Sequence, residues 1–240
     1  KPLYGDGRYT DLSTLDQSRL VAVPISKRYN LKVADIFRQK YSYKEDKHAR
    51  DGKSKSAVSA DTRLSASGQQ PLVAISDALG LKAAFTSQWQ NFPDKLQCQF
   101  PKTKQPATRL YLKMVGTTNA LQSHMRNGTV RVRYADDSTA ELALENPVNW
   151  WPVDQELAQG LPSFYLQRGQ TDVQPPYRMS LRTGQIYRPQ TDGICVPTDG
   201  GAATLLELPL DPTKKPKTLE LECLSNGIVI GIIEAWIETQ

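Results

Sequence analysis

Thr129-Val-Arg-Val-Arg-Tyr-Ala-Asp-Asp-Ser-Thr-Ala-Glu-Leu-Ala-Leu144 is the stretch that decides the fold class of this chain. Apolar and polar side chains alternate in both halves, and alternate side chains of a strand point to opposite faces. The side chains expected on the buried face are Val130, Val132, Tyr134, Ala140, Leu142 and Leu144. Residues 135–138, Ala-Asp-Asp-Ser, separate the halves and are typical of a turn. The stretch therefore predicts an antiparallel hairpin with one face in a core.

Short strands continue on both sides of this hairpin from residue 85 onward. We expect them at residues 109–115, 177–181, 203–208, 218–224 and 229–236, with turn signals such as Arg-Thr-Gly at 182–184 between them. Many short strands at this spacing favour an all-β fold, either a β-sandwich or a jelly roll. The last strand is apolar on both faces, as a central strand would be, and Gly231 within it permits a bulge or a close approach of another chain segment.

The first 80 residues lack this regularity. A strand is expected within residues 18–25, and a short helix over residues 33–40, where Val33, Ile36 and Phe37 have helical spacing. We therefore divide the chain into an irregular N-terminal extension, residues 1–80, and a β-sandwich domain, residues 81–240.

A basic block lies within the extension. Between Lys27 and Arg63 there are eleven Lys or Arg and five Asp or Glu, a balance of +6 in a chain whose net charge is +5. Such a block is usually a solvated loop. The alternative is a surface for an anionic partner: an acidic glycan, a nucleic acid or an acidic domain. Nucleic acid is not expected, because no nucleic-acid-binding module accompanies the basic residues.

Length and hydropathy limit the number of domains and argue against a membrane-spanning segment. The chain has 240 residues, of which 39% are hydrophobic, at the upper end for one domain. No apolar run approaches the roughly 18 residues needed to span a bilayer. The longest, residues 227–237, contains Glu234, so no membrane span is expected. Because the chain begins at Lys1 with neither an initiator Met nor a signal peptide, we expect a processed form or a piece of a longer protein.

Residues that commonly carry catalysis or metals are sparse. The three cysteines, Cys98, Cys195 and Cys223, form no CxxC or metal-finger spacing and allow at most one disulfide. Cys223 shares a strand face with Leu219 and Leu221, which indicates a buried thiol. There are two histidines and no nucleophile, zincin or phosphate-loop motif. No metal site, no cofactor and no catalytic residue are predicted.

A loop with two adjacent tryptophans is the strongest candidate for binding. The loop Asn146-Pro-Val-Asn-Trp-Trp-Pro152 has a proline near each end. Because proline has no N–H to donate to a neighbouring strand, this segment is not expected to be a core strand. Adjacent side chains on an extended backbone point to opposite sides, so Trp150 and Trp151 can both be buried only if both sides are covered. At least one is thus a candidate for exposure, as a platform for sugar stacking. The alternative, and the commoner fate of aromatic side chains, is that both pack under an edge of the sandwich.

The polar residue types that accompany a sugar platform gather around this loop. The ligand-binding residues that we predict are Trp150, Trp151, Asn149, Asn119, Gln122, Asp154 and Gln155, with Arg126 for an acidic sugar. A glycosidase needs two carboxylates about 5–10 Å apart. Asp154 and Glu156 are the only acidic residues near the platform, and acidic loop residues are mostly solvated surface.

Three segments resemble one family of large bacterial proteins of uncharacterised function, found among the secreted polysaccharide-utilisation proteins of gut bacteria. They are residues 85–94 (Phe-Thr-Ser-Gln-Trp-Gln-Asn-Phe-Pro-Asp), residues 115–155 and residues 199–232. The resemblance implies a galactose-binding-like jelly roll beside a larger helical region, the catalytic part, which has no counterpart in this chain. It also implies a periplasmic or extracellular location. Such sandwiches often hold a structural calcium, but no acidic cluster here is strong enough to assign one.

The sequence thus predicts a non-catalytic, carbohydrate-associated β-sandwich that binds a poly- or oligosaccharide. Two alternatives remain open. The module could brace an adjacent helical catalytic domain, with the tryptophan pair buried in that interface, or it could be a glycoside hydrolase in its own right that uses Asp154 or Glu156.

Overall fold

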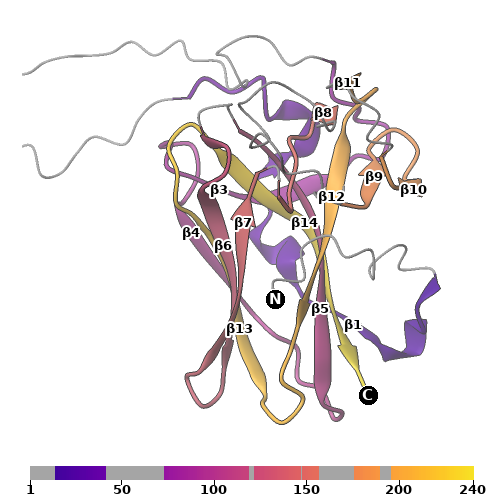
Figure 1. The fold of residues 1–240 in the computed structure, drawn as a ribbon, viewed down its shortest axis with the longest axis vertical. Coiled ribbons are helices and arrows are strands. Elements are labelled where there is room, and N and C mark those ends of the chain that lie inside the picture. Colours follow the sequence, from indigo (N-terminus) through magenta and orange to yellow (C-terminus); the bar gives the residue numbers. More distant parts are fainter. Residues whose placement is uncertain (1–13, 42–72, 119–121, 147, 157–175, 190–195) are drawn as a thin grey trace, which may run out of the picture.

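Two antiparallel sheets pack face to face in the computed structural model, giving an all-β, β-sandwich-like fold (Figure 1). The structure describes residues 14–41, 73–118, 122–146, 148–156, 176–189 and 196–240. Within these ranges there is no α-helix. The helical turns are the short 3-10 turns η2 (Gln17–Arg19), η3 (Ile25–Arg28) and η4 (Val33–Asp35).

The smaller sheet contains the predicted hairpin. Its strands, in spatial order, are β4 (Lys95–Gln99), β13 (Pro216–Cys223), β6 (Arg126–Tyr134) and β7 (Thr139–Glu145). Val130 lies opposite Leu142 and Val132 opposite Ala140. Val130, Val132 and Leu142 are at most 5% exposed, so the predicted hairpin and its buried face are confirmed.

The larger sheet has eight strands. In spatial order they are β10 (Ile186–Tyr187), β9 (Arg178–Ser180), β12 (Ala202–Pro209), β5 (Ala107–Thr117), β14 (Val229–Thr239), β3 (Lys82–Ser87) and β2 (Leu31–Lys32), with β1 (Leu20–Ala22) also paired to β14. A separate two-stranded ladder joins β8 (Gln155–Glu156) and β11 (Val196–Pro197). The strands expected at residues 109–115, 177–181, 203–208, 218–224 and 229–236 are all present, with shifted ends.

Strand β14 is central, as its two apolar faces predict. Ile230 and Ile232 join the core between the sheets, whereas Val229 and Ile233 join a second core on the outer face of the larger sheet. A Cβ added at Gly231 would lie 2.5 Å from the Phe85 ring, which confirms the predicted close approach. Cys223 is fully buried in the core between the sheets, and Cys98 is also a free buried thiol.

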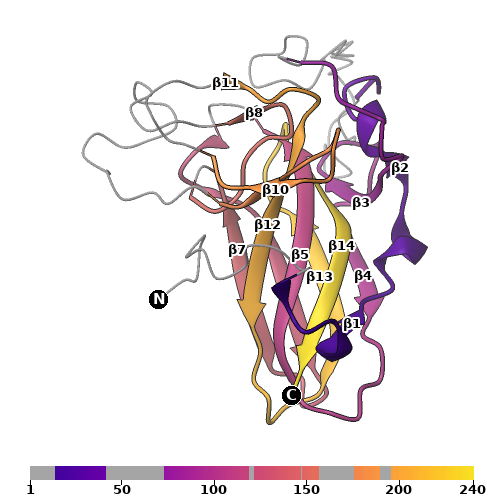
Figure 2. The same ribbon diagram turned by 90° about the vertical axis from the view of Figure 1, so that its right-hand side faces the viewer.

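The described part of the N-terminal extension is built into the sheet. Residues 14–41 pair with β14 and β3 along one side of the larger sheet. In Figure 2 the larger sheet faces the viewer, and this segment, in indigo, lies on the right. The strand expected within residues 18–25 is the three-residue β1, but the helix expected over residues 33–40 does not form, and only the 3-10 turn η4 stands there. Val33 and Ile36 are buried in the outer core, so the helical spacing identified the correct buried face.

Candidate functional site

The structure buries both tryptophans of the proline-fenced loop. Trp150 and Trp151 are each 2% exposed. Trp150 belongs to the core between the sheets, and its Nε1 donates to Oδ1 of Asn127 at 3.1 Å. Trp151 lies under the guanidinium of Arg178, whose Cζ is 5.8 Å from its ring centroid, and Arg178 is itself fully buried. Of the two alternatives for this loop, the structure bears out the burial of both indoles, because both sides of the loop are covered.

The amide side chains of this loop bond to the backbone of β7 and of the loop itself. Asn149 is fully buried; its Nδ2 donates to the carbonyl of Ala143 at 2.7 Å, and its Oδ1 accepts the N–H of Glu145 at 2.9 Å. The Nδ2 of Asn146 donates to the carbonyl of Trp150 at 3.1 Å. A buried amide with these partners holds the loop in shape and is not available to a ligand.

The other predicted binding residues do not form one surface. Asp154 is 4% exposed, Arg126 is exposed, and the carbonyl of Gln122 accepts a hydrogen bond from the Asn127 side chain. Gln155 lies in β8, but its side chain is not described, and Asn119 lies outside the described residues. Asn149, Trp150, Trp151 and Asp154 are all buried, so they form no ligand-binding surface.

Trp236 is the tryptophan that reaches solvent. Trp89, like the two loop tryptophans, is buried, whereas Trp236 is partly exposed on the outer face of β14. It pairs with Tyr111 on β5 and with Ala22 on β1, and Ala22 is exposed and carries only a methyl group. Nζ of Lys113 lies 4.9 Å from the centroid of the Trp236 ring.

Hydrogen-bonding groups flank this ring. Nζ of Lys113 is 2.7 Å from Oε2 of Glu234, and the Tyr111 hydroxyl donates to Oε2 of Glu238 at 3.1 Å. Burial raises the pKa of Tyr111 to about 12, with a further contribution from the charge of Glu238, so this hydroxyl remains a donor at neutral pH. We call these five residues, Trp236, Lys113, Glu234, Tyr111 and Glu238, the Trp236 face.

The sequence carried a signal for this face that we did not use. In Glu234-Ala-Trp-Ile-Glu238, the tryptophan shares its strand face with two glutamates, whereas Ala235 and Ile237 point into the core. Alternation alone therefore places Trp236 toward solvent.

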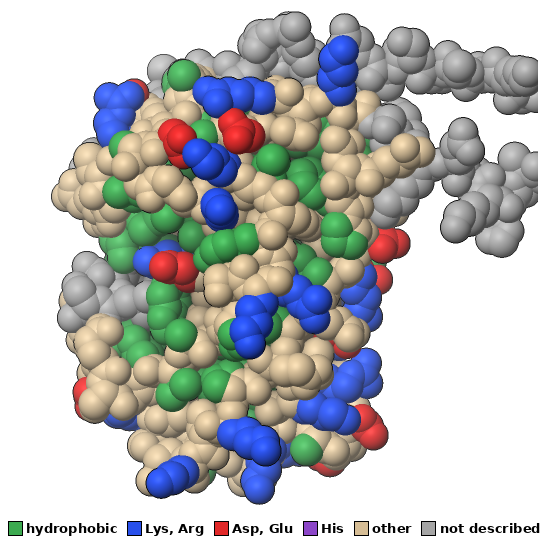
Figure 3. All heavy atoms as spheres, turned by 180° about the vertical axis from the view of Figure 1, so that it is seen from behind, with side chains coloured by type: hydrophobic (Ala, Val, Ile, Leu, Met, Phe, Trp, Pro, Cys, Tyr) green, Lys and Arg blue, Asp and Glu red, His purple; other side chains and the backbone are tan. Residues whose placement is uncertain are grey.

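A groove lies between η3 and β4. It has a volume of about 490 Å³, and its walls are formed by Arg28, Asn30, Pro93, Lys95, Leu96 and Gln97. Lys and Arg predominate over acidic side chains on the face that residues 14–41 cross (Figure 3).

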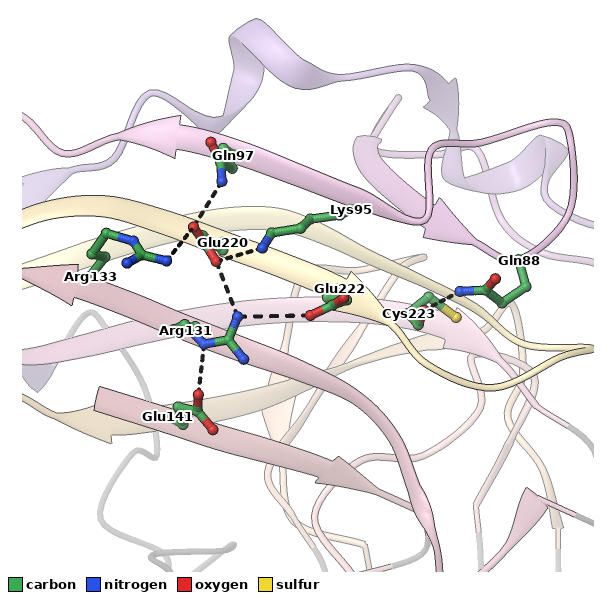
Figure 4. A network of polar contacts seen from close by, with 9 residues as sticks. All are labelled: Gln88, Lys95, Gln97, Arg131, Arg133, Glu141, Glu220, Glu222 and Cys223. Atoms are coloured by element: carbon green, nitrogen blue, oxygen red, sulfur yellow. Dashed lines mark hydrogen bonds and ion pairs between the residues drawn. The ribbon is translucent and has the colours of Figure 1, made fainter. Parts of the chain in front are cut away.

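An ion-pair network covers the outer face of the smaller sheet (Figure 4). Its centre is Glu220 on β13, whose side chain is 2% exposed. Oε2 of Glu220 is 3.0 Å from Nζ of Lys95 and 3.2 Å from a guanidinium nitrogen of Arg131, and Oε1 accepts from Gln97 at 2.8 Å. Burial raises the pKa of Glu220, but hydrogen bonds from Lys95 and Arg131 and their charges outweigh it, so the pKa lies below its ordinary value.

This network predicts acid sensitivity. A carboxyl group with a depressed pKa in the folded state stabilises the protein above its unfolded pKa, here 4.5, and loses that contribution as the pH falls through the folded pKa. Glu220→Gln is therefore expected to cost about 1–3 kcal/mol at pH 7. In urea unfolding at several pH values, the difference from wild type should shrink below pH 4.5.

Glu141→Gln is the matched control on the same sheet face. Glu141 pairs with Arg131 at 2.6 Å but is exposed, so its loss should cost less than about 1 kcal/mol. A Glu220→Gln difference that stayed constant from pH 7 to pH 3 would contradict the assignment.

The described ranges lack two further classes of site. Those residues contain no group of three or more His, Cys, Asp or Glu side chains placed to hold a metal ion. They also contain no helix with the length and hydrophobicity needed to cross a membrane.

No protein-family model, curated protein or solved structure matches this chain.

Proposed function

We propose that this chain is a non-catalytic carbohydrate-binding module of the galactose-binding-like jelly-roll type, and that Trp236 is the residue on which the sugar stacks. The observation that carries the proposal is that Trp236 alone, of the four tryptophans, reaches solvent, and does so from a sheet face rather than from a loop.

The chemistry of the Trp236 face suits a sugar. Sugar sites combine an apolar surface for the C–H face of a pyranose with a few fixed polar groups for its hydroxyls. Here the indole supplies the apolar surface. The half-exposed carboxylate of Glu234 can accept hydrogen bonds from hydroxyl groups while its pairing with Lys113 holds it in place. Because Trp236 stands in a long paired strand, little ordering is required on binding.

Because Trp150 and Trp151 are buried, we place the proposed sugar site at Trp236 and not at their loop. The proposed class, a carbohydrate-binding module, stays the same. The resemblance of residues 85–94, 115–155 and 199–232 to secreted polysaccharide-utilisation proteins supports the same class. We extend the proposal to a periplasmic or extracellular protein in which this module accompanies a separate helical catalytic domain. A hydrolase within this chain is less well supported, because Asp154, one of its two candidate carboxylates, is 4% exposed.

Trp236→Ala is expected to abolish binding of a neutral polysaccharide or weaken it by at least about tenfold, because a large apolar contact is lost. The measurement is a titration with a panel of neutral plant and host polysaccharides, followed by intrinsic fluorescence and by affinity electrophoresis. Since the other three tryptophans are buried, a saturable change in the red-shifted emission reports Trp236.

Leu224→Ala is the control, because Leu224 is a large apolar side chain that is 45% exposed on the smaller sheet's side of the molecule. It should bind as wild type does. The proposal would be overturned if no neutral polysaccharide bound to the wild type, or if Trp236→Ala bound as well as Leu224→Ala.

A further inference from the structure

The groove between η3 and β4 has rigid walls. Oδ1 of Asn30 accepts the backbone N–H of Phe85 at 2.9 Å, and its Nδ2 donates to the Phe85 carbonyl at 3.0 Å. On the opposite wall, Lys95 and Gln97 are both held by the carboxylate of Glu220 (Figure 4). Asn30, Lys95 and Gln97 are therefore held by bonds to the two sheets before any ligand arrives.

The charge around the groove is positive. The network around Glu220 is neutral, since Lys95, Arg131 and Arg133 balance Glu220, Glu141 and Glu222. Asp94, next to Lys95, is exposed and adds one negative charge.

Two further cations outweigh that carboxylate. Lys27 and Arg28 on η3 are exposed, and neither is joined to an acidic side chain in the described part of the chain. Burial raises the pKa of the Cys98 thiol, whereas the charges of Arg28 and Lys27 lower it, which places both cations near β4. A guanidinium without a partner at the wall of a concave site is a receptor for an oxyanion.

The groove also offers apolar surface. Pro93 and Leu96 form part of its lining, beside Arg28 and Lys95. An uncharged pyranose would leave the guanidinium without a partner, and an isolated phosphate would leave the apolar lining without one. An acidic sugar, with an apolar ring face and a carboxylate or sulfate, satisfies both.

We infer that the groove between η3 and β4 is an anion subsite that binds the carboxylate or sulfate group of an acidic polysaccharide, with Arg28 as the primary contact. The inference rests on the proposed carbohydrate-binding function and names its substrate class.

The test compares ligands that differ only in charge. Polygalacturonate and its fully methyl-esterified form share one backbone, as do dextran sulfate and dextran. Wild type should bind at least one charged polymer about tenfold or more tightly than its neutral counterpart, because a charge-assisted hydrogen bond is gained. Arg28→Gln should reduce this preference to roughly threefold or less and leave binding of the neutral polymer unchanged.

Arg182→Gln is the matched control, because it removes the same charge from an exposed arginine that does not line the groove. It should retain the preference for the charged polymer. Equal losses in the Arg28 and Arg182 variants, or no preference in the wild type, would overturn the subsite.

A short ligand separates this test from that of the Trp236 face. Trigalacturonate should shift the backbone amide resonances of residues 94–97 in the wild type but not in Arg28→Gln. Those shifts would support the subsite even if no neutral polysaccharide bound to the protein. Failure of every neutral polysaccharide to bind would contradict only the proposal that sugars stack on Trp236. Unshifted resonances, together with binding that depends on Trp236, would defeat only the subsite.

Discussion

Replacing Trp150 with alanine is expected to lower the free energy of unfolding by about 3–5 kcal/mol, the usual cost of deleting a buried aromatic side chain. The indole is 2% exposed in the core between the sheets. It packs over Gly116, where an added Cβ would lie 3.1 Å from Cζ3 of the indole, so the cavity left by truncation has a backbone floor that cannot collapse readily. The change also removes the donor to Asn127, which is fully buried.

Urea unfolding followed by far-UV circular dichroism measures this cost, with Trp236→Ala as the matched control. The partly exposed Trp236 should cost about 1 kcal/mol, since surface truncations create no cavity. Equal midpoints for the two variants would contradict the assignment of Trp150 to the core. The same pair separates stability from binding: Trp150→Ala should bind polysaccharide normally while it remains folded, and Trp236→Ala should fold normally but not bind.

The longer strands that were predicted from the sequence share one property, a long alternating or continuous apolar run. The β6–β7 hairpin alternates on one face because its other face carries the ion pairs of Arg131 and Glu141. Strand β14 is apolar throughout because it is covered on both sides. Periodicity records how many faces are buried, so these elements could be predicted from the residues alone.

The candidate site could not be located in the same way. Whether Trp150 and Trp151 are exposed depends on what covers the two sides of their loop, and the covering residues Asn127 and Arg178 are distant in sequence. Arg28 and Lys95 form one groove only because η3 packs beside β4. Contacts between segments that are distant in the sequence produce no periodic pattern of apolar residues in either segment.

The attachment of residues 14–41 to the larger sheet could not be predicted for a related reason, because the strands of this segment are too short to show alternation. Strand β1 pairs three residues with β14, and β2 pairs two residues with β3. Backbone and side-chain bonds complete the attachment. The N–H of Val23 donates to the Ala235 carbonyl at 2.9 Å, and Asn30 bridges the N–H and carbonyl of Phe85. The segment therefore covers an edge of the larger sheet that would otherwise present unpaired backbone groups.

Ile25→Asp is expected to detach this segment and to lower the free energy of unfolding by at least about 3 kcal/mol, because it places an unpaired carboxylate in an apolar core. Ile25 is 2% exposed within η3 and packs between the sheets. Ser26→Asp adds the same charge one residue later, at an exposed position, and should be nearly neutral.

Limited trypsin digestion distinguishes detachment from general unfolding. Lys27 and Arg28 lie on η3, so a detached segment should be cleaved there faster in Ile25→Asp than in Ser26→Asp, while the far-UV spectra stay alike. Cleavage at equal rates, with equal unfolding midpoints, would mean that residues 14–41 add little to the sheet. Detachment would also uncover the edges of β3 and β14, and such edges pair with other chains. Ile25→Asp should therefore elute as larger species at high protein concentration, whereas Ser26→Asp should elute as wild type does.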